Sequence, residues 1–355
     1  MNYRVLVINP GSTSTKIAVF EGKEKLFDTT LRYSTEELAS FGWVMEQVDF
    51  RRATIEKALA DNNIDPDSLD AICARGGQVP YCAAGTYRVD QAMVDFMYTR
   101  RQGAHASNLG CVLALLLAKP LGIPAYIVDP VMVDEMDDVA RVSGLPELPR
   151  VSRFHVLNQK ASARLYCREH GLNYEDINLV VVHMGGGTSV AAHKKGRLAD
   201  GNNGLDGDGP FSTDRTGGLP VGGLIDMCYS GKYTHAEMRR KIKGQGGLMA
   251  YVHDTDVKAI EAKALAGDED CKKALDAMIY QTAQEIGKKA VTLKGDVNAI
   301  ILTGGIAHSK YVTDMIRDYV SSIAPVYVYP GEHEMESLGE QSYEALIGKA
   351  EVFEL

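Results

Sequence analysis

The sequence predicts an α/β protein made of two duplicated domains, and three glycine-containing turns that each follow an apolar strand carry this prediction. The first strand, turn and strand span residues 5–20, and a similar arrangement recurs at residues 179–197. The third turn lies within residues 299–308 and also follows an apolar strand. Two similar hairpins about half a chain apart indicate a duplication, with a ligand cleft between the two copies.

The first turn has the composition of a phosphate-binding hinge. Gly11 allows a sharp bend, Ser12 and Ser14 supply hydroxyl donors, and Lys16 supplies a cation. An ordinary hairpin with a polar tip remains an alternative interpretation of this stretch taken alone. The second hinge, Gly185-Gly186-Gly187-Thr-Ser, favours phosphate binding, so the sequence predicts a protein built around a nucleotide.

The composition narrows the class of protein. A chain of 355 residues is long enough for two domains, and 45% apolar with 24% charged residues is typical of globular proteins. The formal net charge of -9, without a basic block, argues against nucleic acid as a partner. The six cysteines have neither Cys-x-x-Cys nor metal-site spacing, and the longest apolar run, residues 111–118, is too short to cross a bilayer. We therefore expect a cytoplasmic protein with reduced cysteines and no membrane span.

The first half of the chain predicts several elements. Ser34 and Glu37 form a capping box that would open a helix extending past Val48. Residues 70–74 form a short strand that delivers Arg75 into a glycine pair, a position from which a cation could bind an anionic substrate. An exposed structural arginine is the alternative interpretation of Arg75. A helix is expected at residues 109–117, directly after His105, which stays a secondary candidate for the site.

Two further candidates follow. Residues 124–128 predict a strand that ends at Asp129, and a carboxylate just past a buried strand is costly unless it is paired or binds metal. A helix reaching Glu169 begins near His155, so this imidazole is expected at a helix N-terminus, where the partial positive potential favours an anion.

The second half predicts the remaining elements. After the second hairpin, a tract rich in Gly, Asn and Asp, residues 200–209, could wrap a ligand and present Arg215. Helices are expected at about 220–243, 256–266 and 270–293, strands at 299–302 and 325–330, and a last helix at about 337–349. We expect one domain to comprise residues 1–149 with 337–355, and the other to comprise residues 150–336.

Taken in order, these motifs resemble those of the acetokinase family, and in particular its butyrate kinase branch. The resemblance spans essentially the whole chain. Besides the three glycine turns, it rests on these stretches: Arg75-Gly-Gly77, Gly103-Ala-His-Ala-Ser-Asn108, Val128-Asp-Pro130, Arg153-Phe-His155 and Asp206 to Arg215. It implies two RNase H-like domains of the type found in the superfamily of sugar kinases, Hsp70 and actin.

The resemblance also implies an activity. It is reversible, direct in-line transfer of a phosphoryl group from Mg-ATP to the carboxylate of butyrate or a related short or branched-chain fatty acid, giving an acyl phosphate and ADP. Arg75 and Arg215 are then expected to bind the carboxylate and the transferring group, and His155 to stabilise the transition state. Asp129 would orient the nucleophile or the metal's ligands. The family further suggests a homodimer or a higher homo-oligomer.

The remaining site residues come from the same resemblance. The phosphates would be contacted from one domain by Asn9, Ser12, Ser14 and Lys16, and from the other by His183, Gly185, Gly186 and Gly187. The adenosine pocket would be bordered by Gly304, Gly305 and Ile306. Mg²⁺ would be held with the help of Glu334, with Glu336 as the alternative.

Two alternatives from other classes remain open at this stage. A sugar kinase of the same superfamily needs a carboxylate base and no arginine pair, and two candidate substrate arginines argue against it. An ATP-driven conformational switch of the Hsp70 or actin type is the second alternative. The adenosine-side Asp-Phe-Arg motif of acetate kinases is replaced here around His253-Asp-Thr-Asp256, so base recognition is expected to differ.

Overall fold

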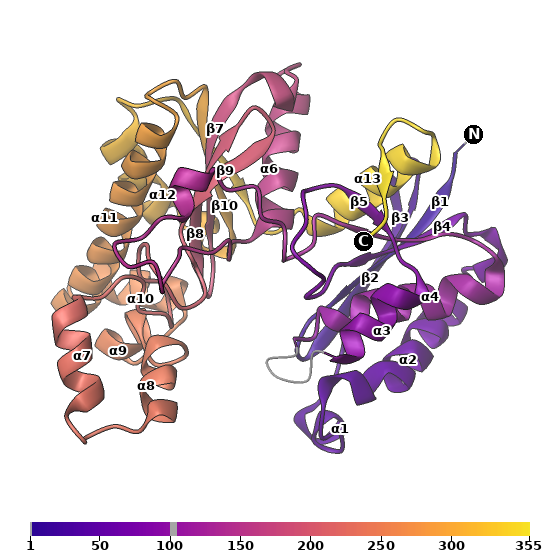
Figure 1. Ribbon diagram of the computed structural model, residues 1–355, viewed down its shortest axis with the longest axis horizontal. Helices are drawn as coiled ribbons and strands as arrows, with labels where there is room; N and C mark the ends of the chain where they lie inside the picture. Colours follow the sequence, from indigo (N-terminus) through magenta and orange to yellow (C-terminus); the bar gives the residue numbers. More distant parts are fainter. Residues whose placement is uncertain (1, 100–104) are drawn as a thin grey trace. The chain divides into compact units, whose positions relative to one another are not determined.

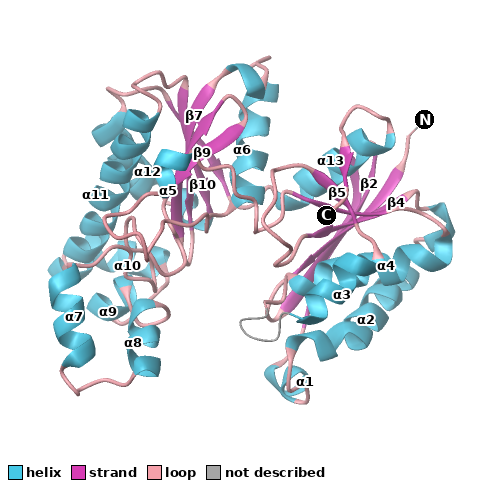
Figure 2. Ribbon diagram, viewed as in Figure 1, coloured by secondary structure: helices cyan, strands magenta, loops and turns pink. Residues whose placement is uncertain are grey.

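A computed structural model describes residues 2–99 and 105–355, and the chain forms two compact units (Figure 1). Unit 1 comprises the chain up to Asp134 together with His333–Leu355, and unit 2 comprises Glu135–Glu332. Each unit contains one β-sheet with helices against both faces (Figure 2). Of the motif at residues 103–108, the first two residues lie outside the described part of the chain.

The sheet of unit 1 is organised around the N-terminal hairpin. Its strands are β1 Arg4–Pro10, β2 Ser14–Glu21, β3 Glu24–Arg32, β4 Ala71–Arg75, β5 Thr86–Arg88, β6 Ala125–Val128 and β12 Val352–Phe353, in the order β12-β5-β6-β4-β1-β2-β3. The predicted hairpin is confirmed, since β1 and β2 pair antiparallel. β4 then adds parallel to β1, and β6 adds parallel to β4, so that these three strands end at one edge of the sheet.

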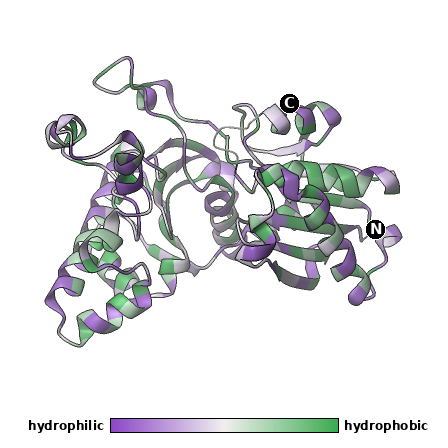
Figure 3. Cartoon of the chain, turned by 90° about the horizontal axis from the view of Figure 1, so that it is seen from below, coloured by the Kyte–Doolittle hydropathy of each residue, from purple (hydrophilic) through white to green (hydrophobic). Residues whose placement is uncertain are grey.

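Helices cover both faces of this sheet. The unit contains α1 Thr35–Ala39, α2 Val48–Asp61, α3 Gln91–Thr99, α4 Asn108–Ala118 and α13 Glu334–Leu346. α4 packs against β1, β4 and β6 from the face of Leu6, Ile8 and Ile72, whereas α13 packs on the opposite face (Figure 2). Figure 3 shows helices that carry hydrophobic and hydrophilic residues side by side, as expected of helices packed on a sheet.

One predicted helix of unit 1 is shorter than expected. The capping box at Ser34 is confirmed, but α1 ends at Ala39 rather than continuing past Val48. A 3₁₀ turn, Val44–Gln47, follows, and α2 begins only at Val48. The break has a local cause, because the Glu46 carboxylate accepts hydrogen bonds from the backbone N–H groups of Gly42 and Trp43 and so starts a new turn.

The sheet of unit 2 repeats the same plan. Its strands are β7 Asn178–Met184, β8 Thr188–Lys194, β9 Arg197–Gly201, β10 Ala299–Gly304 and β11 Val326–Pro330, in the order β11-β10-β7-β8-β9. This order matches β6-β4-β1-β2-β3 of unit 1, with antiparallel pairing on the hairpin side and parallel pairing on the other. The predicted duplication is therefore confirmed.

Both faces of the second sheet are also covered. The helices of this unit are α5 Asp138–Arg141, α6 Val156–Glu169, α7 Val221–Tyr229, α8 His235–Ile242, α9 Gly247–Val252, α10 Val257–Leu265, α11 Glu269–Thr292 and α12 Lys310–Val320. α6 packs on the face of Leu179 and Val181, and α11 packs on the face of Val180 and Val182. Because every residue of β7 is buried, its apolar run is continuous rather than alternating.

Two expectations for these helices were wrong. The helix expected at 220–243 is interrupted between α7 and α8, where Gly231 takes a φ of +73° and Thr234 caps the next helix. The helical spacing of apolar residues in α11 predicts a core face formed by Leu275, Met278, Ile279, Ile286 and Val291; the first four are buried, but Val291 is 76% exposed. Among the helices described, none combines the length and the apolar character that crossing a bilayer requires.

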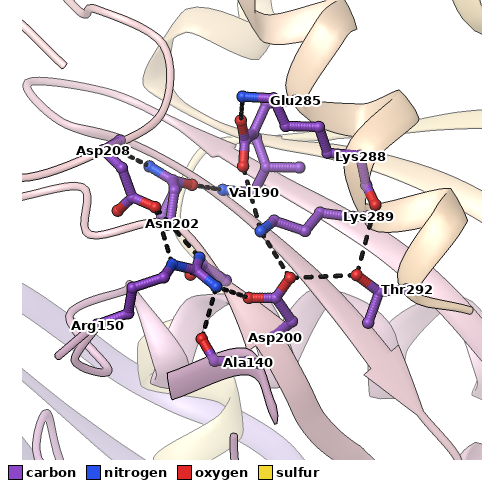
Figure 4. Close-up of polar contacts among 12 residues, drawn as sticks. Ala140, Arg150, Val190, Asp200, Asn202, Asp208, Glu285, Lys288, Lys289 and Thr292 are labelled. Atoms are coloured by element: carbon purple, nitrogen blue, oxygen red, sulfur yellow. Dashed lines mark hydrogen bonds and ion pairs between the residues drawn. The ribbon is translucent and has the colours of Figure 1, made fainter. Parts of the chain in front are cut away.

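Along the chain, unit 1 ends at Asp134 and unit 2 begins at Glu135, earlier than the change of domain expected at 149/150, because residues 135–149 are bound to the rest of unit 2. Glu135 forms an ion pair of 3.0 Å with the buried Lys160. The guanidinium of Arg150 bonds the Ala140 carbonyl at 2.7 Å and the Asp200 carboxylate at 2.9 Å (Figure 4). The return to unit 1 likewise comes at 333 rather than 337, since α13 already begins at Glu334.

Candidate active site

In unit 1, three residues selected from the sequence lie together at the strand ends. Asn9 is near the end of β1, Arg75 is the last residue of β4, and Glu334 is the first residue of α13. The Glu334 Oε2 atom accepts a hydrogen bond of 2.7 Å from Asn9 Nδ2 and one of 3.3 Å from Arg75 Nη1. Ligands of open sheets bind beyond the carboxyl ends of parallel strands, which is where this cluster lies.

Glu334 and Glu336 have different surroundings. The Glu334 residue is only 4% exposed, whereas the Glu336 side chain is 48% exposed and forms an ion pair of 3.3 Å with Lys25. Among the described residues, no three His, Cys, Asp or Glu side chains gather as a metal site. Glu334 can supply one carboxylate and Asn9 one amide oxygen. These two donors fit Mg²⁺, because this ion is usually bound by one or two protein side chains, with waters and substrate phosphates as its other ligands.

The hinge between β1 and β2 is held by an arginine that sequence reasoning missed. Arg51 lies in α2, is fully buried, and donates from Nη1 to the carbonyls of Gly11 (2.8 Å) and Ser14 (3.0 Å). Its Nη2 atom donates to the Ser12 carbonyl at 3.1 Å. Ser12 and Lys16 are exposed. Nothing in the sequence around Arg51 signals this contact, because it is made across forty residues of chain.

Asp129 lies directly after β6, one position beyond the residue that pairs with Arg75 in the parallel register. Its residue is 1% exposed, and its Oδ1 atom accepts a hydrogen bond of 2.9 Å from the Gly85 N–H. The backbone has a φ of +41°, in the left-handed region that residues other than glycine rarely adopt. Such strain is typical of functional sites, and the bond to Gly85 supplies pairing for the buried carboxylate.

In unit 2, His155 and His183 form a stacked pair. His155 immediately precedes α6, as expected, and His183 lies in β7. Their rings are parallel within 12°, with centroids 3.8 Å apart. The Nδ1 atom of His183 lies 2.8 Å from Asn158 Nδ2, and a Cβ added at Gly185 would lie 3.4 Å from His183 Nε2. The pair therefore lies beside the first glycine of the second hinge.

Arg215 packs against the third glycine of the same hinge. A Cβ at Gly187 would come within about 2.1 Å of Arg215 Nη1, so only glycine leaves room for the guanidinium. Nη1 donates to the Gly204 carbonyl at 2.6 Å, and the buried Nε atom has no hydrogen-bond partner among the described residues. Burial lowers the pKa of Arg215, against the opposing effect of Asp214 and Asp206. Arg215 is half-buried and also forms an ion pair of 3.7 Å with Asp214, and a guanidinium with an Nε–H that makes no hydrogen bond is suited to an anionic ligand.

A cavity of ≈ 940 Å³ in unit 2 adjoins two of the glycine turns. Of the residues selected from the sequence, it is lined by Gly185, Gly186, Gly305 and Ile306. The lining also includes residues that were not selected from the sequence, among them Thr213, Asp214, Lys258, Glu261, Ser309 and Lys310. Thr255 and Asp256 also line it, so the segment that departs from the acetate kinase motif lies at this cavity.

Gly304 has a different part in the structure from its neighbour. Its φ is +90°, and an added Cβ would lie 2.3 Å from the Met184 carbonyl oxygen, so glycine is needed for the close approach of β10 to β7. A Cβ at Gly305, by contrast, would meet nothing within 4 Å. Gly304 is thus required by the backbone, and Gly305 is open to the cavity.

Two comparisons of the sequence with known proteins agree on one family. The model of the acetokinase family matches residues 154–348. Butyrate kinase 1 of Clostridium acetobutylicum is 50% identical to this chain over 347 residues, which cover 98% of each chain. Butyrate kinase 2 of the same organism is also 50% identical, over 351 residues that cover 99% of each chain.

Solved structures agree on the fold. The acetate kinase of Porphyromonas gingivalis has a TM-score of 0.78 at 18% identity, covering 97% of this chain and 100% of that one. The acetate kinase of Entamoeba histolytica has a TM-score of 0.77 at 16% identity, covering 96% and 99%. The two-domain α/β fold expected from the sequence is thereby confirmed.

Proposed function

This chain belongs to the acetokinase family, and we propose that it catalyses the reversible transfer of a phosphoryl group from ATP to the carboxylate of butyrate, giving butanoyl phosphate and ADP. The observation that carries this proposal is identity of 50% to two butyrate kinases over nearly the full length of each chain. Related short and branched-chain fatty acids belong to the proposed substrate range. Neither a sugar kinase nor an ATP-driven switch is favoured by any contact described above.

The chemistry sets an electrostatic problem, because an anionic carboxylate must approach an anionic phosphate. Positioning and neutralisation of charge dominate such transfers. In our proposal Arg75 binds the carboxylate and Arg215 the transferring group. The Nε–H of Arg215 supports this role, since it makes no hydrogen bond among the described residues and lies 3.7 Å from its ion-pair partner Asp214, so a phosphoryl oxygen would satisfy it. His155, at the N-terminus of α6, stabilises the charge that develops on the phosphoryl oxygens.

The nucleotide is proposed to occupy the cavity of unit 2, with adenosine beside Gly305 and Ile306 and phosphates beside Gly185, next to which His183 lies. In the same proposal, the hinge of unit 1 contacts the phosphates through Asn9, Ser12, Ser14 and Lys16. Glu334, with Asn9, would hold Mg²⁺, which neutralises phosphate charge when bound. Asp129 would orient the acyl carboxylate.

We further propose that the protein acts in the cytoplasm, where ATP is available, and as a homodimer or a higher homo-oligomer. The six cysteines, all described and all free thiols, fit a reducing compartment. Analytical ultracentrifugation of the purified chain would decide the oligomeric state, and a single species at 38.6 kDa would contradict this part of the proposal.

The activity is tested by trapping acyl phosphate with hydroxylamine, with ATP, Mg²⁺ and in turn acetate, propionate, butyrate, isobutyrate, valerate and isovalerate. We expect product to peak at four or five carbons. Arg215→Ala should lose most of the product, whereas Arg52→Ala, which removes a half-buried arginine on α2 that pairs with Glu56, should keep it. If no acid gave product while ATP still bound, the proposal would fail.

A further inference from the structure

Behind His155, a line of buried polar side chains runs into unit 2. The His155 Nδ1 atom lies 2.8 Å from Ser189 Oγ, and this oxygen also lies 2.9 Å from Gln159 Nε2. Gln159 Oε1 lies 3.0 Å from His193 Nε2. The other ring nitrogen of His193, Nδ1, lies 2.6 Å from the Tyr174 hydroxyl. We name these four residues the relay: Ser189, Gln159, His193 and Tyr174.

The direction of each bond in the relay follows from the orientation of Gln159. Besides the Ser189 hydroxyl, Gln159 Nε2 also approaches the backbone carbonyl of Ser189, at 3.2 Å. A carbonyl oxygen only accepts, so the amide nitrogen and not the amide oxygen of Gln159 faces Ser189. The amide oxygen therefore faces His193, and His193 Nε2 must carry the proton that it accepts.

The directions of the bonds at the far end of the relay follow from the neutral state of His193. Complete burial, together with the nearby cations Lys160 and Arg164, lowers the pKa of His193 well below its ordinary value. A neutral imidazole has one N–H, and Nε2 holds it. Nδ1 is then an acceptor, and the Tyr174 hydroxyl donates to it.

At the other end of the relay, the hydrogen bonds made by Ser189 determine which atom its hydroxyl donates to. The Ser189 Oγ atom accepts from Gln159 Nε2 and, at 3.3 Å, from the backbone N–H of His155. A hydroxyl has two acceptor lone pairs and one hydrogen, so both lone pairs are used. The single hydrogen must go to His155 Nδ1, which is therefore an unprotonated acceptor.

We infer that the relay is a positioning device that holds His155 as a neutral imidazole with its proton on Nε2. A proton on Nδ1 would face the Ser189 hydroxyl hydrogen with no lone pair left to receive it. The relay thus selects one tautomer, much as a carboxylate fixes a metal-binding or catalytic histidine. Here, uncharged side chains do so within a buried network.

The consequence for the reaction rests on the function proposed above. An imidazole fixed in this tautomer presents an N–H donor from Nε2, ready to bond an oxygen of the transferring phosphoryl group. Because the donor is oriented before the reaction begins, no reorganisation is needed as charge develops. His183, which is stacked on His155, accepts a hydrogen bond at Nδ1 from Asn158 Nδ2. His183 therefore also carries its proton on Nε2.

The inference is tested first by nitrogen-15 NMR of the full-length protein, labelled with nitrogen-15 at its histidines. The His155 signals are assigned by their absence in His155→Gln. In the unsubstituted protein we expect an unprotonated Nδ1 and a protonated Nε2. A protonated Nδ1 in this protein would overturn the inference without any variant being needed.

Two variants then interrupt the relay at different points. Ser189→Ala removes the donor to His155, and Gln159→Met removes the bond that directs the Ser189 hydroxyl. In both we expect a mixture of tautomers at His155 and a kcat about 10- to 100-fold lower, as for other partners that orient a site residue. KM for ATP and for butyrate should change by no more than about 3-fold, because neither residue touches a substrate.

The matched control is Thr282→Val, which removes a buried hydroxyl that donates to Met278 within α11 and lies outside the relay. It should leave the tautomer and kcat unchanged. If Ser189→Ala and Gln159→Met kept the Nε2 tautomer, or kept kcat, the relay would be refuted. If the unsubstituted protein made no acyl phosphate yet showed the Nε2 tautomer, the proposed function would fail and the relay would stand.

Discussion

Glu334 differs from its near neighbour Glu336 in burial and in the cation that each contacts. Glu334 bonds Asn9 and Arg75, whereas Glu336 contacts Lys25 at the surface. We predict that Glu334→Gln raises the Mg²⁺ concentration needed for half-maximal activity about 10-fold, because the uncharged amide is a weaker Mg²⁺ ligand. Titration of acyl phosphate formation with Mg²⁺ measures this, and Glu336→Gln is the control. Equal Mg²⁺ dependence in the two variants would refute a metal role for Glu334.

The glycine pair of the third turn gives a second prediction at this scale. Gly304→Ala forces a Cβ against the Met184 carbonyl at a φ of +90°, so we expect a loss of stability of more than about 2 kcal/mol. Gly305→Ala meets no atom within 4 Å but lies in the cavity proposed for ATP, so we expect a higher KM for ATP with unchanged stability. Urea unfolding and ATP kinetics separate the two effects. Similar stability of both variants would contradict this division.

At the scale of elements, a buried ion-pair network joins β9, α11 and the segment before α6 (Figure 4). Lys289 is 3% exposed and bonds Asp200 at 3.0 Å and Glu285 at 3.1 Å. Burial alone would raise the pKa of Asp200, but Lys289 and Arg150 outweigh this effect and lower it. The network therefore keeps the Asp200 carboxylate charged while it is buried, and so joins three distant parts of the sequence.

We predict that Lys289→Met destabilises unit 2 by about 3 kcal/mol, since it leaves two buried carboxylates with fewer partners. Lys288 is the matched control, because it bonds the other oxygen of Glu285 while its side chain is 69% exposed. Lys288→Met should cost no more than about 1 kcal/mol. Urea unfolding of both variants checks the difference, and equal free energies of unfolding would show that the network adds little.

At the scale of the molecule, the elements near the glycine turns could be predicted because each has its own local signal. The hairpins β1–β2 and β7–β8, β4, β6 and the start of α6 at His155 all follow from apolar runs and turn residues. β3, β5, β9 and β12 were missed. β12 is only two residues long, and it forms because β5 is available to pair with it.

The residues of the candidate site also fall into two groups, those with a local signal in the sequence and those placed only by tertiary packing. Arg75, Asp129 and His155 could be selected as candidates because each stands at the end or beginning of a predicted element. Arg51 could not be found, because its contacts with the first hinge depend on how α2 packs. The relay was also missed, since Gln159, Ser189 and His193 are ordinary core residues until tertiary structure places them in line behind His155.

The C-terminal segment belongs to the first unit although it follows the second in sequence, and this arrangement gives the last prediction. α13 packs against β1, β4 and β6, Leu338 is fully buried, and a Cβ at Gly339 would lie 2.7 Å from the ring of Phe20. The helix therefore covers the central strands of the first sheet on one face.

A chain that ends at Glu332 should leave that face exposed to water. We expect hydrogen exchange to accelerate in β1 and β4, while β7 and β10, whose cores lie wholly within unit 2, keep their protection. A chain that ends at Phe353 retains α13 and β12 and should exchange like the full chain. Unchanged exchange in β1 and β4 after the longer truncation would mean that unit 1 is stable without its C-terminal helix. In that case α13 would serve chiefly to bring Glu334 to Asn9 and Arg75.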